Sequence, residues 1–154
     1  MKHGLLDKPR FRKHKCGNQL VKEEASIYLD PLQVGVGMKN GADAVIHSVQ
    51  RLVAENQHKK DYGMLKVDFS NAFNILAREK MILEVKENFP ILSPWIEFCY
   101  GNQPLLFFGD MVIKSCEGVQ QGDPLGPLLF ALTIQPLIQK IHRECPELDL
   151  NCFY

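Results

Sequence analysis

The sequence predicts an α+β fold, and three observations support this prediction. Apolar residues recur at helical spacing over residues 42–53, 76–88 and 125–132, as in helices with one buried face. Two apolar runs flank Gly109-Asp110, which indicates a β-hairpin. Strands and helices do not alternate regularly, so a doubly wound α/β sheet is not expected. With 154 residues, the chain is long enough for one domain with its own core.

The first half of the chain is expected to contain two helices and a strand. The first helix is expected over residues 18–29, followed by the glycine-rich loop "PLQVGVGMKNG" (31–41). Asn40 is a suitable N-cap for the second helix. That helix would place one apolar stripe on its packed face: Ala42, Val45, Ile46, Val49, Leu52 and Val53. The run "MLKVDF" (64–69) is expected to be a short strand.

The second half is expected to contain three helices, a hairpin and a final strand. Helices are predicted over residues 76–88 and 94–100, and the hairpin over residues 105–115. A further helix should start at Asp123-Pro124, because proline is favoured at the first helical position. Pro136 should kink or end that helix. The tail "LDLNCFY" (148–154) is expected to be a strand.

Composition excludes several classes of protein. Hydrophobic residues make up 45% and charged residues 23%, which is ordinary for a soluble domain, and no apolar run is long enough for a transmembrane helix. The charged N-terminus lacks the apolar core of a secretory signal, so an intracellular location, nucleus or cytoplasm, is expected. The five cysteines are widely spaced without a C-x-x-C, which argues against a zinc knuckle or a disulfide framework.

Charge is balanced overall but unevenly distributed. Residues 1–22 carry seven Lys/Arg and one Asp, whereas the remainder carries eleven Lys/Arg and seventeen Asp/Glu. The basic stretch "KPRFRKHK" (8–15) could contact phosphates. The alternative is a solvated terminus with no binding role. We therefore interpret residues 1–30 as a basic lead-in, in part disordered, and residues 31–154 as the folded domain.

One candidate site lies in "KVDFSNAFN" (66–74). Asp68 stands at the end of an apolar stretch, and Phe73 follows five positions later. A carboxylate on a rigid strand end suits a magnesium ion, which prefers oxygen ligands. Taken alone, the pattern is more typical of an ordinary strand end with an aspartate capping a turn.

A second candidate site lies in "QGDPLGPLLF" (121–130). Gly122 and Gly126 allow close approach to the backbone, and the Gln121 amide can hydrogen-bond a base or a nucleic-acid backbone. The helix start at Pro124 directs free N–H groups towards any nearby anion. Taken alone, this motif too has an ordinary interpretation as a loop and a helix cap.

Together, in this order and about fifty residues apart, the two motifs resemble the palm of a reverse transcriptase, most closely of the non-LTR (LINE-like) retrotransposon group. "PLQVGVGMKNGADAVIHSV" (31–49) resembles the fingers segment of that family, and "CYGNQPLLFFGD" (99–110) its connecting hairpin. The resemblance covers about residues 28–154. It implies a partial fingers–palm of a right-hand polymerase that lacks the thumb.

The resemblance also implies a metal site and a set of partners. Asp68 would bind the catalytic Mg²⁺ ions, or Mn²⁺ in their place, and the backbone carbonyl of Phe69 would add a ligand. The intact family polymerises DNA by two-metal nucleotidyl transfer, so its partners are an RNA template, a DNA primer and a dNTP. Neither a membrane nor a particular protein partner is implied.

Further residues match the nucleotide site of the family. The residues that would line the triphosphate are Ser70, Asn71 and Ala72. Phe73 resembles the steric gate, whose ring occupies the space of a ribose 2′-hydroxyl; ordinary core packing is the other interpretation of this residue. Gln121 and Gly122 match the loop that contacts the incoming nucleotide and the template.

The chain departs from the family pattern at its third palm motif, an aromatic residue, a variable residue and two aspartates. Tyr154 resembles the first letter of that motif, and the two aspartates are not present. One carboxylate cannot clamp two magnesium ions about 3.5–4 Å apart. Asp110 and Asp123 suit a turn and a helix cap instead, and nothing marks Asp149 as a ligand.

We therefore expect the chain alone to be inactive as a polymerase. It would be either a fragment of a reverse transcriptase domain or a non-enzymatic retroelement remnant that binds nucleic acid or has no activity. A third interpretation is an unrelated α+β domain in which both motifs occur by chance.

Overall fold

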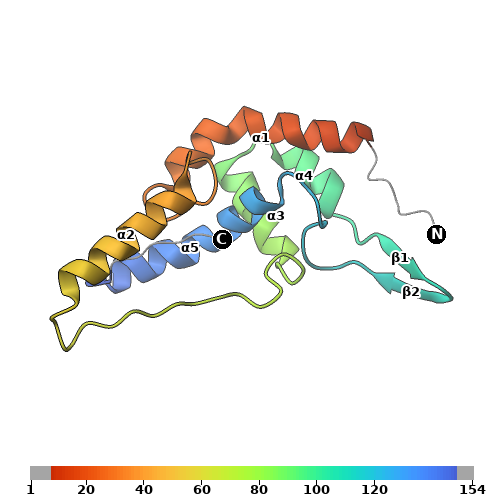
Figure 1. The fold of residues 1–154 in the computed structure, drawn as a ribbon. Helices are drawn as coiled ribbons and strands as arrows, with labels where there is room; N and C mark the ends of the chain where they lie inside the picture. Colours follow the sequence, from red (N-terminus) through yellow and green to blue (C-terminus); the bar gives the residue numbers. More distant parts are fainter. Residues whose placement is uncertain (1–7, 149–154) are drawn as a thin grey trace.

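The computed structural model describes residues 8–148, with side chains from residue 17 onwards. The helices of this part are α1 (Lys8–Leu29), α2 (Gly41–Asn56), α3 (Arg78–Asn88), α4 (Ser93–Tyr100) and α5 (Gly126–Glu144). The strands β1 (Leu105–Phe108) and β2 (Met111–Lys114) form an antiparallel hairpin. Figure 1 shows α1 across the top of the molecule, with α3 and α4 below it, and the hairpin projecting to one side. None of the described helices is both long and apolar enough to cross a membrane.

Helix α5 is the centre of the core. It packs against α1 and α3, and α3 in turn packs against α4. Five consecutive residues of α5, from Leu128 to Leu132, are buried, so this helix is covered on several faces rather than along one stripe. The other elements contribute further buried side chains: Val21, Ala25, Leu29, Met81, Val85, Phe89 and Ile96.

A buried pair of amides supports α5 beside its proline. Gln33 Nε2 donates to the carbonyl of Ala131 at 2.9 Å and to Gln135 Oε1 at 2.7 Å. Gln135 Nε2 in turn donates to the carbonyl of Tyr28 at 2.8 Å. Pro136 removes one helical N–H donor, yet α5 continues past it to Glu144. The expectation that the helix might end there is therefore wrong.

Most of the predicted elements are confirmed. Helices occupy the predicted positions, the hairpin turns at Gly109-Asp110, and Asn40 is the residue before α2, although its side chain makes no capping hydrogen bond. Helix α1 begins at Lys8, ten residues before the predicted start. Helix α5 begins at Gly126, so the predicted start at Asp123-Pro124 is wrong, and the proline in its first turn is Pro127. The predicted final strand at residues 148–154 lies almost wholly outside the described residues.

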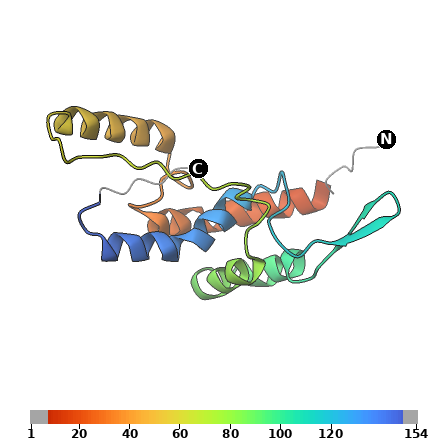
Figure 2. The same ribbon diagram turned by 90° about the horizontal axis from the view of Figure 1, so that it is seen from below.

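The predicted strand at residues 64–69 is wrong. This segment is exposed along its whole length and belongs to no strand. Figure 1 shows it as an extended trace beneath α2 and α5, and Figure 2 shows the same path from below. A strand requires a neighbouring strand for its backbone N–H and C=O groups, and neither of the described strands pairs with this segment.

The predicted packing of α2 is also wrong in part. Within the described residues, α2 packs against no other helix or strand. Its apolar stripe is half-buried at Val45, Val49 and Leu52, but Ile46 and Val53 are exposed. The helix therefore forms through its own hydrogen bonds and leaves much of its apolar surface in contact with solvent.

Candidate functional site

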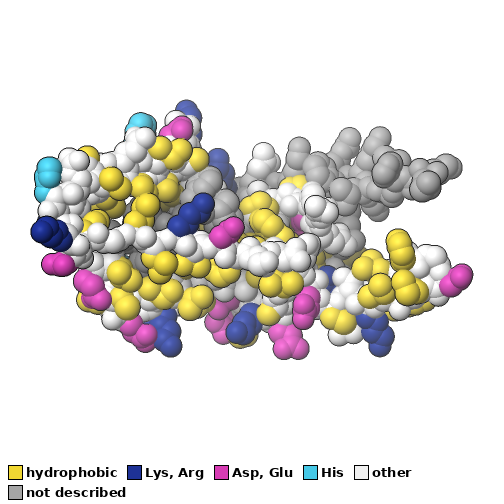
Figure 3. Space-filling model, turned by 60° about the horizontal axis from the view of Figure 1, so that its bottom comes forward, with side chains coloured by type: hydrophobic (Ala, Val, Ile, Leu, Met, Phe, Trp, Pro, Cys, Tyr) yellow, Lys and Arg dark blue, Asp and Glu magenta, His cyan; other side chains and the backbone are white. Residues whose placement is uncertain are grey.

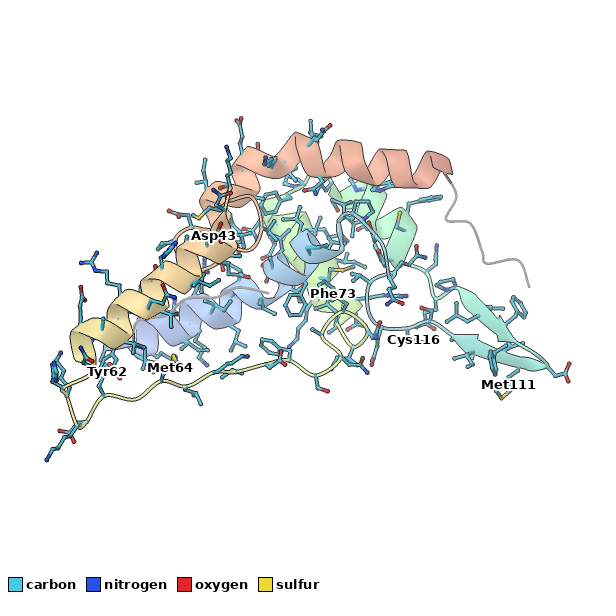
Figure 4. The ribbon with its side chains drawn as sticks, in the orientation of Figure 1. Asp43, Tyr62, Met64, Phe73, Met111 and Cys116 are labelled. Carbon is cyan, nitrogen blue, oxygen red and sulfur yellow. The ribbon has the colours of Figure 1, made fainter. Side chains whose placement is uncertain are left out.

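Two of the predicted site residues meet on one buried ring of α5. The ring centroid of Phe69 lies 5.9 Å from that of Phe130, and the ring centroid of Phe73 lies 5.4 Å from it. Phe130 is buried, whereas Phe69 and Phe73 are 50% and 38% exposed. Figure 4 shows Phe73 between the extended segment and the start of α5. The two outer rings therefore form an aromatic wall with open edges, and Asp68 stands exposed immediately before it.

A tight turn lies between Phe69 and Phe73 and lets both rings reach Phe130. Asn71 adopts the left-handed conformation, with φ 57°, and its carbonyl accepts hydrogen bonds from the N–H groups of Asn74 at 2.9 Å and Ile75 at 3.2 Å. The side chain of Asn74 also donates to Asn71 Oδ1 at 3.1 Å. Asparagine tolerates this conformation because its short polar side chain bonds locally. Within the turn, Ser70 is exposed and Ala72 packs against the core.

The loop that carries Gln121 and Gly122 is fastened to this turn. The N–H of Gly118 donates to the carbonyl of Leu76, and the N–H of Val119 donates to the carbonyl of Phe73, both at 2.8 Å. Gly118 has φ +71°, and a Cβ atom there would overlap the carbonyl of Asn74, so only glycine fits. The structure thus brings together the two motifs that are about fifty residues apart in the sequence.

Arg78, the first residue of α3, holds the same loop by side-chain hydrogen bonds. Its Nε donates to the carbonyl of Gly118 and its Nη2 to Ser115 Oγ, both at 2.8 Å, and its Nη1 donates to the carbonyl of Ser115. The guanidinium also lies over the ring of Tyr100, with 5.5 Å from Cζ to the centroid. A planar fork of five donors suits this arrangement better than an ammonium group would.

Asp123 holds the far end of the loop. The hydroxyl of Tyr100 donates to Asp123 Oδ2, and the N–H of Leu125 donates to Asp123 Oδ1 at 2.9 Å. Burial raises the pKa of Tyr100 above its ordinary value, and the adjacent Asp123 carboxylate raises it further. The interpretation of Asp123 as the helix cap is wrong, because Leu125 is the N-cap of α5 and Asp123 instead closes the turn before it. Gln121 and Gly122 remain exposed between Gly118 and Asp123.

The donor chemistry around Asp68 fits a magnesium ion as one part of a site. A carboxylate and the neighbouring Phe69 carbonyl are oxygen ligands of the type that magnesium prefers. Asp123 is turned into the core, and Asp110 lies at the hairpin turn. Among the described residues, no group of three or more His, Cys, Asp or Glu side chains is arranged to hold a metal.

Several residues of this region were not identified from the sequence. The apolar stripe predicted for α5 consists of Leu125, Leu128, Leu129 and Leu132, and Phe130 lies off it. An apolar residue off the stripe was the available sign of a second buried face. Arg78 has no such sign, because its partners Ser115 and Gly118 are 37 and 40 residues away in the sequence. Gly118 and Tyr100 likewise gain their roles only through contacts that are distant along the chain.

Comparison with known proteins places the chain in a family. A family model described as "Reverse transcriptase (RNA-dependent DNA polymerase)" matches residues 6–154. No curated protein and no solved structure matches the chain. The family match spans nearly the whole sequence, including the two motifs that the structure joins. The chain therefore belongs to the reverse transcriptase (RNA-dependent DNA polymerase) family.

Proposed function

We propose that this chain is part of the fingers and palm of a non-LTR retrotransposon reverse transcriptase, which synthesises DNA on an RNA template inside the cell. The observation that carries the proposal is the joining of the two motifs. Backbone hydrogen bonds fasten the turn after Asp68 to the loop before Gln121, and Phe69 and Phe73 share the ring of Phe130. A fixed relation between these segments is what a nucleotide site requires. In this proposal the basic residues lie at the start of α1, while its later part, with Val21, Ala25 and Leu29 buried, belongs to the same core as α3, α4 and α5.

Each residue of the site has a role in this proposal. The Asp68 carboxylate and the Phe69 carbonyl bind Mg²⁺ or Mn²⁺, which supplies charge stabilisation for nucleotidyl transfer. The turn residues Ser70, Asn71 and Ala72 line the triphosphate, and Gln121 and Gly122 contact the base and the template. Phe73 excludes a ribose 2′-hydroxyl. Its fixed position against Phe130 supports this role, because a steric barrier discriminates only if it cannot move aside.

Residues 1–154 by themselves should not polymerise DNA. Asp68 supplies one carboxylate, and a two-metal site needs others. Nucleic-acid binding without turnover is the second candidate function. It is favoured by the seven Lys/Arg residues within residues 1–22, of which those from Lys8 onwards lie on α1.

The test combines the transcript with primer extension. We expect the reading frame to continue past codon 154 with an acidic pair, and the protein made from that longer frame to extend a DNA primer on RNA with magnesium. Asp68→Ala should reduce extension by at least about 1000-fold, since it removes a metal ligand. Asp61→Ala, at an exposed acid outside the site, is the matched control and should leave extension unchanged.

Two further measurements complete this test. Phe73→Val in the longer protein should raise the use of ribonucleotides relative to deoxynucleotides. The chain of residues 1–154 should show no extension. Extension by this chain that persists in Asp68→Ala would contradict the assignment of the metal site.

A further inference from the structure

The β1–β2 hairpin exposes apolar residues on both of its faces. Among the described elements each strand pairs only with the other. At least half of the surface of each of its seven apolar residues is exposed: Leu105, Leu106, Phe107, Phe108, Met111, Val112 and Ile113. Figure 3 shows these hydrophobic side chains on a projection that stands away from the body. A two-stranded hairpin is marginally stable alone, so the structure calls for a partner at this place.

The hydrogen-bond pattern of the hairpin shows which backbone groups are available. The N–H of Ser115 donates to the carbonyl of Pro104 at 2.9 Å, which makes 104/115 a hydrogen-bonded pair. Because such pairs alternate along an antiparallel ladder, 105/114 and 107/112 are the non-hydrogen-bonded pairs. The N–H and C=O groups of Val112 and Lys114 therefore point outwards, to the free edge of β2.

We propose that the chain forms a dimer in which β2 pairs antiparallel with β2 of a second copy. A two-fold axis through Val112 places it opposite Val112 of the second copy, so the outward groups of both strands face each other. The same register places Lys114 opposite Asp110 of the second copy, and the symmetry repeats this ion pair. The product is one four-stranded sheet with the strand order β1-β2-β2-β1.

Charge and edge chemistry favour this register and this edge. A register shifted by two residues would leave both Lys114 and Asp110 without an opposite charge. A register shifted by one residue would place the outward N–H and C=O groups opposite residues whose own backbone groups point towards β1. The outer edge of β1 carries only Leu105 and Phe107 and follows Pro104, which has no N–H to donate. Charges on an edge normally prevent pairing, but this pair is self-complementary across a two-fold axis.

This dimer requires no nucleotide or metal, so its test is independent of the proposed enzyme activity. The chain should sediment as a monomer–dimer equilibrium that shifts with concentration up to about 100 µM. Val112→Pro should abolish the dimer, because it removes the central outward N–H while leaving the β1–β2 hydrogen bonds in place. Phe107→Pro makes the same change on the outer edge of β1 and should leave the dimer intact.

A charge exchange gives the sharpest test. Lys114→Asp and Asp110→Lys, made separately, each place like charges opposite one another and should weaken the dimer about tenfold or more. The double variant D110K/K114D should restore it, and mixing the two single variants should give a heterodimer.

Three outcomes would overturn the proposal. One is a chain that stays monomeric throughout this range. Another is a dimer that is sensitive to Phe107→Pro but not to Val112→Pro. The last is polydisperse association that the charge-exchange variants do not change. This is expected if the apolar hairpin is covered by another partner or if it aggregates without a fixed strand register.

Discussion

Several leucine side chains of the helices around α5 are buried, whereas those of the extended parts of the chain are exposed. Leu129 in α5 is completely buried, whereas Leu65 in the extended segment is 87% exposed. The hairpin resembles the extended segment, since its apolar residues are also exposed. The molecule thus has a packed group of helices, α1, α3, α4 and α5, and extended segments whose apolar surface is not covered by the described residues.

The difference follows from where each type of element finds its hydrogen bonds. A helix satisfies its backbone groups internally, so α1, α3, α4 and α5 can assemble from their apolar faces alone. A strand needs a neighbouring strand before its side chains can be buried. Residues 64–69 have an apolar composition suited to a sheet but lack that neighbour. The hairpin and residues 64–69 therefore depend on pairing in a way that the packed helices do not.

A matched pair of leucine substitutions should give the largest contrast between the packed helices and the extended segments. Leu129→Ala removes a fully buried side chain and should lower the free energy of unfolding by about 3 kcal/mol. Leu65→Ala removes an exposed one and should change it by less than about 0.5 kcal/mol. Urea unfolding followed by circular dichroism at the helix band measures both. Similar losses for the two variants would mean that residues 64–69 are packed in solution.

Two glycines should give a smaller contrast, between the fastened loop and the free hairpin. Both have positive φ, +71° at Gly118 and +59° at Gly109, but a Cβ would meet the Asn74 carbonyl at Gly118 and open space at Gly109. Gly109→Ala should therefore cost about 1 kcal/mol, the strain of the conformation alone. Gly118→Ala should cost about 2–3 kcal/mol and speed amide exchange at Val119, measured by NMR. Equal costs would show that the loop is not held against residues 73–76.

The sequence predicts elements that are locally determined better than those that need distant partners. Periodic apolar residues located the helices, and Gly109 located the hairpin turn, because both signals act within a few residues. The same reasoning failed at residues 64–69, where an apolar run was interpreted as a strand. A strand also needs a second strand to pair with, and the run itself does not indicate whether one lies beside it. The apolar pattern indicated that this segment favours extended β structure, but pairing with another strand decides whether it becomes a strand.

The candidate site shows the same limit. The resemblance predicted Phe69 and Phe73 as neighbours of a nucleotide, and that role stays a prediction. The structure shows that both rings pack against Phe130, which the sequence did not single out. Arg78 could not be identified, because a single arginine at a helix start has no local pattern that distinguishes it from a solvated one. Its role depends on carbonyls that only the folded chain brings within reach.

The smallest predicted effect concerns the buried Tyr100–Asp123 contact and its dependence on pH. Tyr100 ionises near pH 10 in the unfolded chain, while burial and the Asp123 carboxylate raise its pKa in the folded state. Above pH 10 the unfolded state therefore holds fewer protons, and the stability gained from this raised pKa is lost as pH increases, by about 1.4 kcal/mol per pH unit.

Tyr100→Phe removes that ionisation from both states. The difference in unfolding free energy between the wild type and this variant should be constant from pH 7 to 9, where neither state titrates Tyr100. It should then shift against the wild type by about 1 kcal/mol between pH 10 and 11. Contributions from other groups, including Tyr28, whose pKa is also raised, are common to both proteins and cancel in the difference. A constant difference up to pH 11 would show that the Tyr100 hydroxyl ionises as readily in the fold as in the unfolded chain. The loop that carries Gln121 and Gly122 would then lack its buried anchor at Asp123.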